Sequence, residues 1–207
     1  GRTEFARAVM GLDPIDSGEI LLEKKKLQGK ETNEIIHAGI GYLTENRREE
    51  GLILEMGIRK NSTLASLGRM VVGPFGRIDQ KMEKQITTGL MEKLRIVATD
   101  TEQLVQNLSG GNQQKVVLSK CLALEPKVYI LDEPTRGVDV GAKDEIHKII
   151  LSLVENGASV ILISSEMEEI LRLSDRILVM HKGIIRGEVT PQEATQENLV
   201  KLTGVGV

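Results

Sequence analysis

The sequence has few aromatic residues and almost no cysteine. Among its 207 residues there are two phenylalanines, two tyrosines and no tryptophan, although 40% of the residues are hydrophobic. The chain therefore has enough apolar material for a sizeable core, and that core must consist mainly of aliphatic side chains. Cys121 is the single cysteine, so an intrachain disulfide is excluded, and we expect this residue to be a small buried apolar side chain.

Other absences narrow the function classes. The three histidines, His37, His147 and His181, are far apart in the sequence and match no metal-ligand spacing. A net charge of -3 argues against binding to nucleic acid, which requires a basic face. No apolar run approaches the ~20 residues of a membrane span, and no signal-peptide pattern opens the chain. These features predict a soluble, cytosolic protein.

The C-terminal part of the sequence alternates between short apolar runs and helical patterns. The runs "KVYIL" (127–131) and "ASVILISSE" (158–166) predict strands, and residues 141–157 between them have helical spacing. Further predicted elements are a helix at 166–174, two strands within 175–187 joined by a turn at Lys182 and Gly183, and a polar helix at 196–202. Short apolar strands separated by helices predict an α/β fold with a mostly parallel sheet covered on both faces.

The N-terminal part has a different texture. A helix is predicted at 5–12, followed by strands at 17–22 and 39–43. Residues 46–107 show no convincing strand, and in residues 79–96 apolar side chains recur at intervals of three and four. We interpret 46–107 as a helical subdomain inserted into a core of residues 1–45 and 108–207, all within one domain.

Two adjacent acidic residues follow the strand "VYIL". In an open parallel sheet, ligands bind beyond the carboxyl ends of the strands, so Asp132 and Glu133 are well placed for chemistry. Asp132 could hold Mg²⁺, directly or through water, while Glu133 could polarise an attacking water. Pro134 ends the strand and fixes the turn that directs both side chains. The alternative is that this pair is simply a solvated strand end.

A second motif, "LSGGNQQK" (108–115), precedes an apolar helix. Ser109 can cap that helix, and Gly110 and Gly111 allow the backbone to approach a ligand closely. The free N–H groups at a helix N-terminus bind anions, so phosphate is the expected ligand. The alternative is an ordinary capped helix with no ligand.

In combination, "LSGGNQQK" and "VYILDEPTRGVDVGAK" resemble the signature, Walker B and D-loop segments of ATP-binding-cassette ATPases, in the version found in bacterial monosaccharide importers. Both the order and the spacing match, and the resemblance covers essentially the whole chain. It implies a P-loop NTPase core, with ATP and Mg²⁺ as cofactors. In this family two cassettes enclose two nucleotides head to tail, so the signature acts on the nucleotide of the opposing cassette. The signature candidates are Ser109, Gly110, Gly111, Asn112 and Gln113, and Asp139 is the D-loop candidate.

The opening "GRTE" resembles the last four positions of the family's phosphate-binding loop, GxxGxGK followed by Ser or Thr. We therefore expect the chain to be an N-terminally truncated fragment, without the first strands and most of the loop. The resemblance implies that Gly1 to Glu4 contact nucleotide and that the Thr3 hydroxyl and Asp132 ligate Mg²⁺. Arg2 replaces the family's usual lysine with a planar group of different geometry, and Glu4 places a negative charge near the phosphates.

Two further positions depart from the family pattern. Glu45, in "GYLTENR", replaces the usual Q-loop glutamine, and Ser165 replaces the switch histidine that contacts the γ-phosphate. The departures fall in the site that this half would build on its own Walker motifs, whereas its signature is intact. They indicate the C-terminal cassette of a tandem sugar importer, with Glu133, Ser165 and Glu45 as its catalytic positions.

The resemblance leaves two functions open. The chain is either an ATPase half that energises monosaccharide import, or a regulatory half that binds nucleotide with little hydrolysis and donates its signature. The implied partners are the N-terminal cassette of the same polypeptide, transmembrane permease subunits and, indirectly, a periplasmic or extracellular sugar-binding protein, with the chain at the cytoplasmic face of the membrane. A cassette of translation or DNA repair is less favoured, because the chain has no basic arm or long coiled coil.

Overall fold

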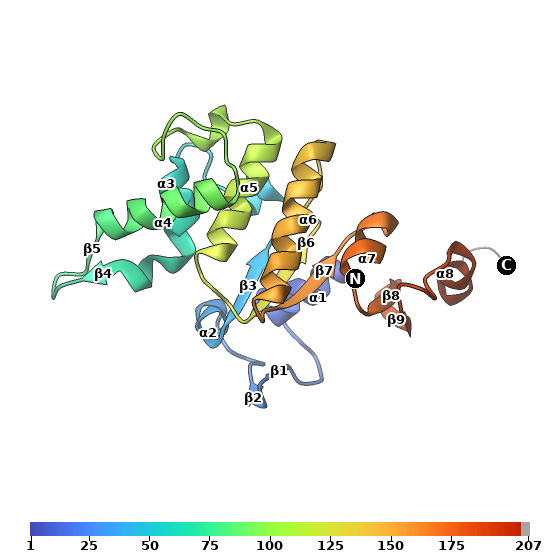
Figure 1. Ribbon diagram of the computed structural model, residues 1–207. Coiled ribbons are helices and arrows are strands. Elements are labelled where there is room, and N and C mark those ends of the chain that lie inside the picture. Colours follow the sequence, from blue (N-terminus) through green and yellow to red (C-terminus); the bar gives the residue numbers. More distant parts are fainter. Residues whose placement is uncertain (204–207) are drawn as a thin grey trace.

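Three parallel strands form the central sheet of the computed structural model, which describes residues 1–203 (Figure 1). β6 (Val128–Asp132) lies between β3 (Ile40–Leu43) and β7 (Ser159–Ile163). Ile40 pairs with Val128, and Val128 with Ser159, so all three strands end at the same edge of the sheet. The predicted α/β fold with a parallel sheet is confirmed.

Helices cover both faces of this sheet. On one face, α1 (Arg2–Val9) and α2 (Thr32–Ala38) pack against a cluster that includes Ile130. On the other, α5 (Gly110–Leu122) and α6 (Val140–Glu155) pack against a larger cluster that includes Leu131. Because side chains alternate along a strand, neighbouring residues of β6 belong to opposite clusters.

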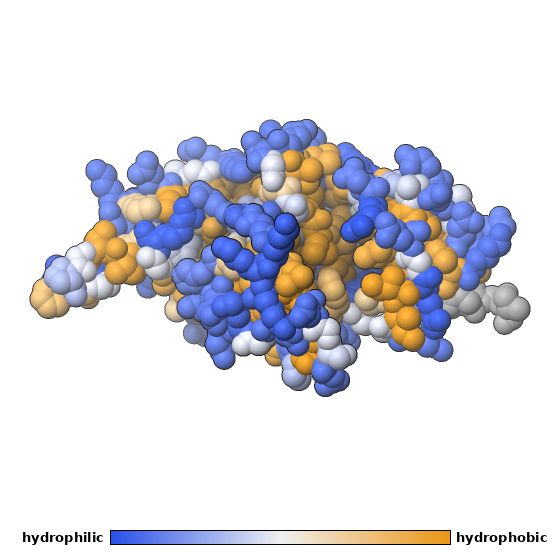
Figure 2. Space-filling model, turned by 90° about the horizontal axis from the view of Figure 1, so that it is seen from below, coloured by the Kyte–Doolittle hydropathy of each residue, from blue (hydrophilic) through white to orange (hydrophobic). Residues whose placement is uncertain are grey.

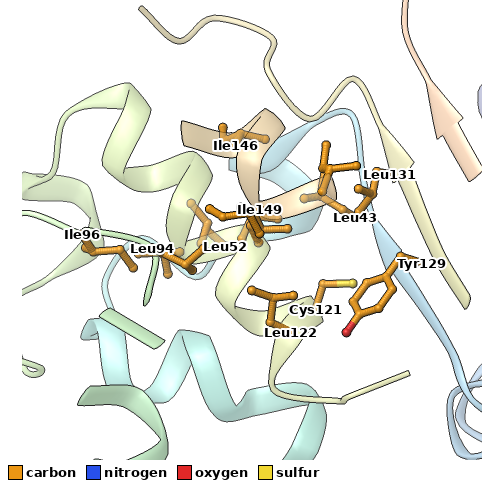
Figure 3. Packing of buried hydrophobic residues seen from close by; sticks show 14 of the residues in the cluster. Leu43, Leu52, Leu94, Ile96, Cys121, Leu122, Tyr129, Leu131, Ile146 and Ile149 are labelled. Carbon is orange, nitrogen blue, oxygen red and sulfur yellow. The ribbon is translucent and has the colours of Figure 1, made fainter. Parts of the chain in front are cut away.

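The larger cluster is almost entirely aliphatic, as the composition predicts. Tyr129 is its one aromatic member among the described residues. Figure 3 shows the Cys121 thiol pointing toward the Tyr129 ring. Cys121 is 2% exposed, and burial raises its pKa to about 12, so the thiol is neutral and behaves as an apolar side chain. This agrees with the expectation from the sequence.

Residues 46–107 are largely helical. They contain a π-helical turn (Arg47–Gly51), α3 (Ile58–Thr63), a 3₁₀ segment (Leu64–Met70), α4 (Gln80–Lys93) and a second 3₁₀ turn (Val105–Asn107). Asp79 caps α4 by accepting hydrogen bonds from the backbone of Lys81 and Met82.

The expectation that this segment lacks strands is wrong. β4 (Val71–Val72) and β5 (Arg77–Ile78) form an antiparallel hairpin, which projects at the left of Figure 1. Gly73 and Gly76 adopt the positive φ angles that close so short a hairpin. The hairpin carries apolar side chains on the surface (Figure 2), and Phe75 at its tip is 87% exposed.

The N-terminal prediction also needs correction. A strand was expected over 17–22, but only β1 (Leu21–Leu22) forms, paired with β2 (Lys25–Lys26). The turn residues Glu23 and Lys24 have positive φ, so the chain reverses after two residues instead of extending a core strand. α2 was not predicted, although Glu31 and Glu34 form a capping box at its start.

The C-terminal elements agree with the sequence pattern. α7 (Met167–Leu173) follows β7, and β8 (Ile177–His181) and β9 (Ile184–Val189) form an antiparallel pair around Lys182 and Gly183. The last element is α8 (Gln196–Thr203). None of the helices in residues 1–203 is both long and apolar enough to cross a membrane.

Gly41 and Gly89 provide a matched test of the packing, since the same substitution meets opposite surroundings. A Cβ on Gly41, in β3, would lie 2.7 Å from Pro126 and 2.9 Å from Cys121, whereas one on Gly89, within α4, would meet nothing within 4 Å. We expect Gly41→Ala to lower the free energy of unfolding by about 1–3 kcal/mol through overpacking. Gly89→Ala should raise it by about 0.5–1 kcal/mol, because alanine is the better helix former. Urea unfolding measures both changes in free energy. Equal changes in the free energy of unfolding would contradict the close packing around β3.

Candidate functional site

A buried carboxylate lies at the carboxyl end of β6. Asp132 is fully buried, and its Oδ2 accepts a weak hydrogen bond from the Tyr42 hydroxyl at 3.5 Å. Its Oδ1 has no hydrogen-bond partner in the described part of the chain. Burial raises the pKa of Asp132, although hydrogen bonding to Thr3 and Tyr42 opposes this shift. An unpaired buried oxygen is costly, and a cation or a water is the group that would satisfy it.

The N-terminal turn of α1 packs over this edge of the sheet. The Thr3 hydroxyl donates to Glu45 Oε2 at 3.4 Å and lies near enough to Asp132 to lower that carboxyl's pKa. Arg2 Nη1 donates to the Ser164 carbonyl at 2.8 Å, just past the end of β7. Glu4 is exposed and contacts the Gly1 nitrogen at 2.9 Å. Arg2 and Thr3 thus lie near the carboxyl ends of the central strands, whereas the predicted contact of Gly1 to Glu4 with nucleotide stays a prediction.

Glu133 has a strained backbone. Its φ of 50° lies in the left-handed region, which costs a non-glycine residue roughly 1–2 kcal/mol. Its N–H donates to the Ile163 carbonyl at 2.8 Å, and its Oε2 accepts from the Ser165 hydroxyl at 3.2 Å. The Glu133 backbone and carboxylate are therefore held in place at the adjacent ends of β6 and β7. Such strain concentrates at functional sites.

Two arginines connect the ends of β3 and β6. Arg136 forms an ion pair with Glu45, and Arg47 Nη1 donates to the Arg136 carbonyl at 3.0 Å. The Arg47 guanidinium also lies next to Gly110, since a Cβ added there would be 3.0 Å from Nη2. These side chains link the Glu45 segment to the start of α5.

The start of α5 is capped as the sequence predicts. Ser109 Oγ accepts from the Asn112 backbone at 3.3 Å and from its side-chain amide at 3.1 Å. Asp139 caps the neighbouring helix α6 by accepting from the Ala142 backbone at 2.9 Å. A Cβ on Gly111 would lie 3.5 Å from Asp139 Oδ2, so the two helix N-termini are adjacent. Two adjacent N-termini concentrate free N–H groups in one place.

Gln113 is the one buried residue among the signature candidates. Its side-chain amide donates to the Val105 carbonyl at 3.1 Å, and its backbone N–H donates to Ser109 within the helix. Its Oε1 has no hydrogen-bond partner among the described residues. The prediction that Gln113 contacts nucleotide, together with Ser109, Gly110, Gly111 and Asn112, stays a prediction.

The candidate residues thus form two groups. One surrounds the end of β6 and includes Arg2, Thr3, Glu45, Asp132, Glu133 and Ser165. The other lies at the starts of α5 and α6. The arginines that connect these groups were not predicted, because no local spacing marks a side chain that acts across 89 or more positions.

Comparison with known proteins agrees with these motifs. The ABC transporter family pattern matches residues 1–136, which is more than half of the chain. The chain belongs to the ABC transporter family. Its predicted resemblance to cassette ATPases is therefore confirmed.

Similar ABC transporter proteins include ribose import ATP-binding proteins. The RbsA protein of Bacillus licheniformis is 48% identical over 206 residues, which cover 100% of this chain and 41% of that protein. The RbsA protein of Lactococcus lactis subsp. cremoris is 49% identical over 206 residues, which cover 100% of this chain and 42% of that protein. The chain thus spans about two fifths of the length of these relatives.

Solved ABC transporter structures show the same fold. The ADP conformation of an ATP-binding cassette of an ABC transporter has a TM-score of 0.79 at 21% identity, covering 100% of this chain and 84% of that chain. A dimeric post-hydrolysis cassette bound to ADP and phosphate has a TM-score of 0.79 at 19% identity, covering 92% of this chain and 81% of that chain. These similarities confirm the fold of ABC ATPase cassettes.

The buried Asp132 carboxylate generates a stability prediction. Because its folded-state pKa is raised, the folded protein binds this proton more tightly than the unfolded chain, and stability falls as pH rises through the folded pKa. Asp132→Asn keeps the shape and removes the buried charge. We expect this variant to unfold at or above the wild-type temperature at pH 7 without nucleotide, with the difference shrinking toward acid pH.

Asp144→Asn is the matched control. Asp144 is exposed, and its ion pair with Arg172 lowers its pKa, so the sign of the effect is opposite. Removing the Asp144 charge should leave stability unchanged or lower it slightly at pH 7, and it should not raise the melting temperature. Thermal unfolding followed by circular dichroism compares the two variants. A lower melting temperature for Asp132→Asn than for Asp144→Asn would contradict the buried-charge assignment.

Proposed function

We propose that this chain is the second nucleotide-binding cassette of an ATP-hydrolysing protein that energises monosaccharide import. The observation that carries the proposal is the group formed by Asp132, Glu133 and Thr3, where a buried oxygen without a partner lies beside a hydroxyl and a second carboxylate. Support for the second-cassette role comes from the relatives, which are ribose import ATP-binding proteins more than twice as long as the chain.

The residues present fit a magnesium ion with incomplete protein ligation. The Asp132 Oδ1 and the Thr3 hydroxyl are hard oxygen ligands, which Mg²⁺ prefers. Residues 1–203 contain no group of three acidic, histidine or cysteine side chains that could hold a metal alone, so phosphate and water would complete the shell. When bound, the ion would neutralise charge on the phosphates of ATP.

The side chains of this chain have separate roles in the proposed hydrolysis. Glu133 orients the attacking water and accepts its proton, since its carboxylate is 9% exposed and already held by the Ser165 hydroxyl. Ser165 orients that carboxylate from the end of β7. Arg2 supplies positive charge near the phosphates, and Glu45 stands next to Thr3.

The signature residues act on a different nucleotide in this proposal. Ser109, Gly110, Gly111 and Asn112 lie at the adjacent starts of α5 and α6, apart from the Asp132 group. Their helix N-termini would meet the γ-phosphate held by the partner cassette. Asp139, which caps α6, stands at the same edge.

A regulatory cassette is the alternative function. One Arg2 donor is already used by the Ser164 carbonyl, and Glu45 carries a negative charge, paired with Arg136, that would repel phosphate. This favours weak binding or slow hydrolysis at the chain's own site. Turnover by the full-length protein with Glu133→Gln separates the two functions, because a regulatory site would tolerate this change.

The partners follow from the same proposal. Residues 46–107 form a helical subdomain, whose segment 46–67 contacts the membrane permease. Residues 1–45 and 108–207 form the core, and 204–207 lie outside the described residues. The other partners are an N-terminal cassette and, indirectly, a sugar-binding protein. The chain would then act at the cytoplasmic face of the membrane, held there by the permease.

Ser109→Arg should separate the signature from the chain's own site. The substitution removes a helix cap, which costs about 1 kcal/mol and is tolerable for a domain of this size. It also displaces the donors for a γ-phosphate, and losing one preorganised donor typically costs ~10²-fold or more in rate. We expect loss of ATP turnover in membranes containing the assembled transporter, with the protein still folded.

Ser165→Ala is the control for that experiment. Ser165 is exposed and contributes a single 3.2 Å hydrogen bond to Glu133. The variant should therefore keep most of the ATP turnover and sugar uptake. Equal losses in Ser109→Arg and Ser165→Ala would contradict the larger contribution expected from the signature serine.

A crosslinking experiment tests the permease contact. The chain has one native cysteine, Cys121, and it is buried, so introduced cysteines can be labelled selectively. Glu55 is an exposed position in the proposed contact region, and Lys148 is an exposed position on α6. We expect Glu55→Cys to crosslink to the permease in membranes and Lys148→Cys not to. Crosslinks from Glu55→Cys to the partner cassette alone would contradict the proposed contact.

A further inference from the structure

A buried polar cluster lies directly beneath the strained Glu133 turn. Thr135, two residues after Glu133, donates its hydroxyl to Glu169 Oε1 at 2.9 Å. His147 Nε2 lies 2.8 Å from the same oxygen, and because a carboxylate can only accept, the histidine N–H donates. All three residues are buried, with 2%, 3% and 7% of Thr135, Glu169 and His147 exposed.

The cluster joins three elements that the site depends on. Thr135 belongs to the turn after β6, Glu169 to α7 and His147 to α6. Glu169 is four residues beyond Ser165, whose hydroxyl contacts the Glu133 carboxylate. The loops that carry Glu133 and Ser165 are therefore linked twice. One link is the hydrogen bond between these two side chains, and the other is the buried hydrogen bond from Thr135 to Glu169.

The connection depends on a single oxygen atom. Glu169 Oε2 and His147 Nδ1 have no hydrogen-bond partner within the described residues. Oε1 therefore carries both hydrogen bonds of the cluster. Hydrogen bonds to a charged group in a dry interior are stronger than exposed ones. Removing the Thr135 hydroxyl should therefore loosen the turn that carries it.

Pro134 is also held from the other side. Gln114, on α5, donates its side-chain amide to the Pro134 carbonyl at 2.8 Å, and this contact is buried. The two residues after Glu133 are thus anchored by α5 and by α7. A left-handed non-glycine conformation persists only where the surroundings over-determine it, and these anchors are the surroundings of Glu133.

We propose that Glu169, supported by His147, is a positioning residue that holds Glu133 in its strained orientation by anchoring Thr135. The proposal rests on the proposed role of Glu133 as the group that activates water. If the cluster were purely structural, it would stabilise the whole domain and have no selective effect on the loop that carries Glu133. The two roles therefore differ in what a conservative change at Thr135 does.

Thr135→Val and Thr135→Ser form the matched pair. Valine keeps the shape and removes the hydroxyl donor, whereas serine keeps the donor and removes a methyl group. In the full-length protein, we expect the amide hydrogens that residues 133–137 carry, Pro134 having none, to exchange roughly tenfold faster in Thr135→Val, as for one lost hydrogen bond to a charged acceptor. Thr135→Ser should exchange as the wild type does, and exchange in α4 should be unchanged in both variants.

Steady-state ATP turnover provides the second readout. Because only the orientation of Glu133 is disturbed, Thr135→Val should lower kcat by roughly tenfold, less than the ~10²-fold or greater loss expected on removing a general base. KM for ATP should be unchanged, and Thr135→Ser should restore kcat. In a Glu133→Gln background, Thr135→Val should have no further effect, since a positioning residue acts only through the group it positions.

The outcomes separate this inference from the proposed function. Unchanged exchange of residues 133–137 in Thr135→Val would overturn the anchoring role. Faster exchange with unchanged kcat, in a protein that Glu133→Gln inactivates, would overturn the positioning role. If Glu133→Gln itself kept full turnover, the proposed role of Glu133 would fail, and with it the positioning role, while the exchange data would still show whether Glu169 anchors the turn.

Discussion

β6 is hydrogen-bonded on both sides, and this arrangement fixes the place where its carboxyl end leaves the sheet. Its neighbours β3 and β7 end at the same edge, so Glu45, Asp132, Glu133 and Ser165 meet there although up to 120 positions separate them. Helices pack on both faces and exclude water from the strands. The buried Asp132 carboxylate is a consequence, because its strand cannot move to expose it without breaking two ladders of hydrogen bonds.

The polar residues at the start of α5 show how one short segment organises several loops. Asn112 accepts from the Val97 backbone, Gln113 donates to Val105 and Gln114 donates to Pro134. Lys115 donates to the Arg95 carbonyl and pairs with Glu145 on α6. Four consecutive side chains thus point around the helix toward four different segments. These contacts fix the position of α5, and α5 in turn positions the exposed residue that caps it, Ser109.

The parts of the fold that follow from local sequence were predictable. Alternating apolar runs and helical spacing indicate the parallel strands, and the Ser109 cap and the turn at Lys182 have local signatures. The β4–β5 hairpin was missed because strands of two residues give no periodicity. The buried hydrogen bond from Gln113 to Val105 has no local signature, because a motif marks a residue without saying which way its side chain points. Contacts such as Arg136 with Glu45, or Thr135 with Glu169, appear only when distant loops are brought together.

Two of the contacts that hold the turn after β6 differ in strength. The ion pair between Arg136 and Glu45 is at the surface, with 63% and 36% of the two side chains exposed, and such pairs contribute at most about 1 kcal/mol. It can therefore give way at little cost in free energy. The contact between Thr135 and Glu169 is buried, so breaking it would leave polar groups unpaired in a dry interior. Glu45 can then respond to a ligand while the backbone of Glu133 stays in place, which is the combination a site needs if it must bind, react and release.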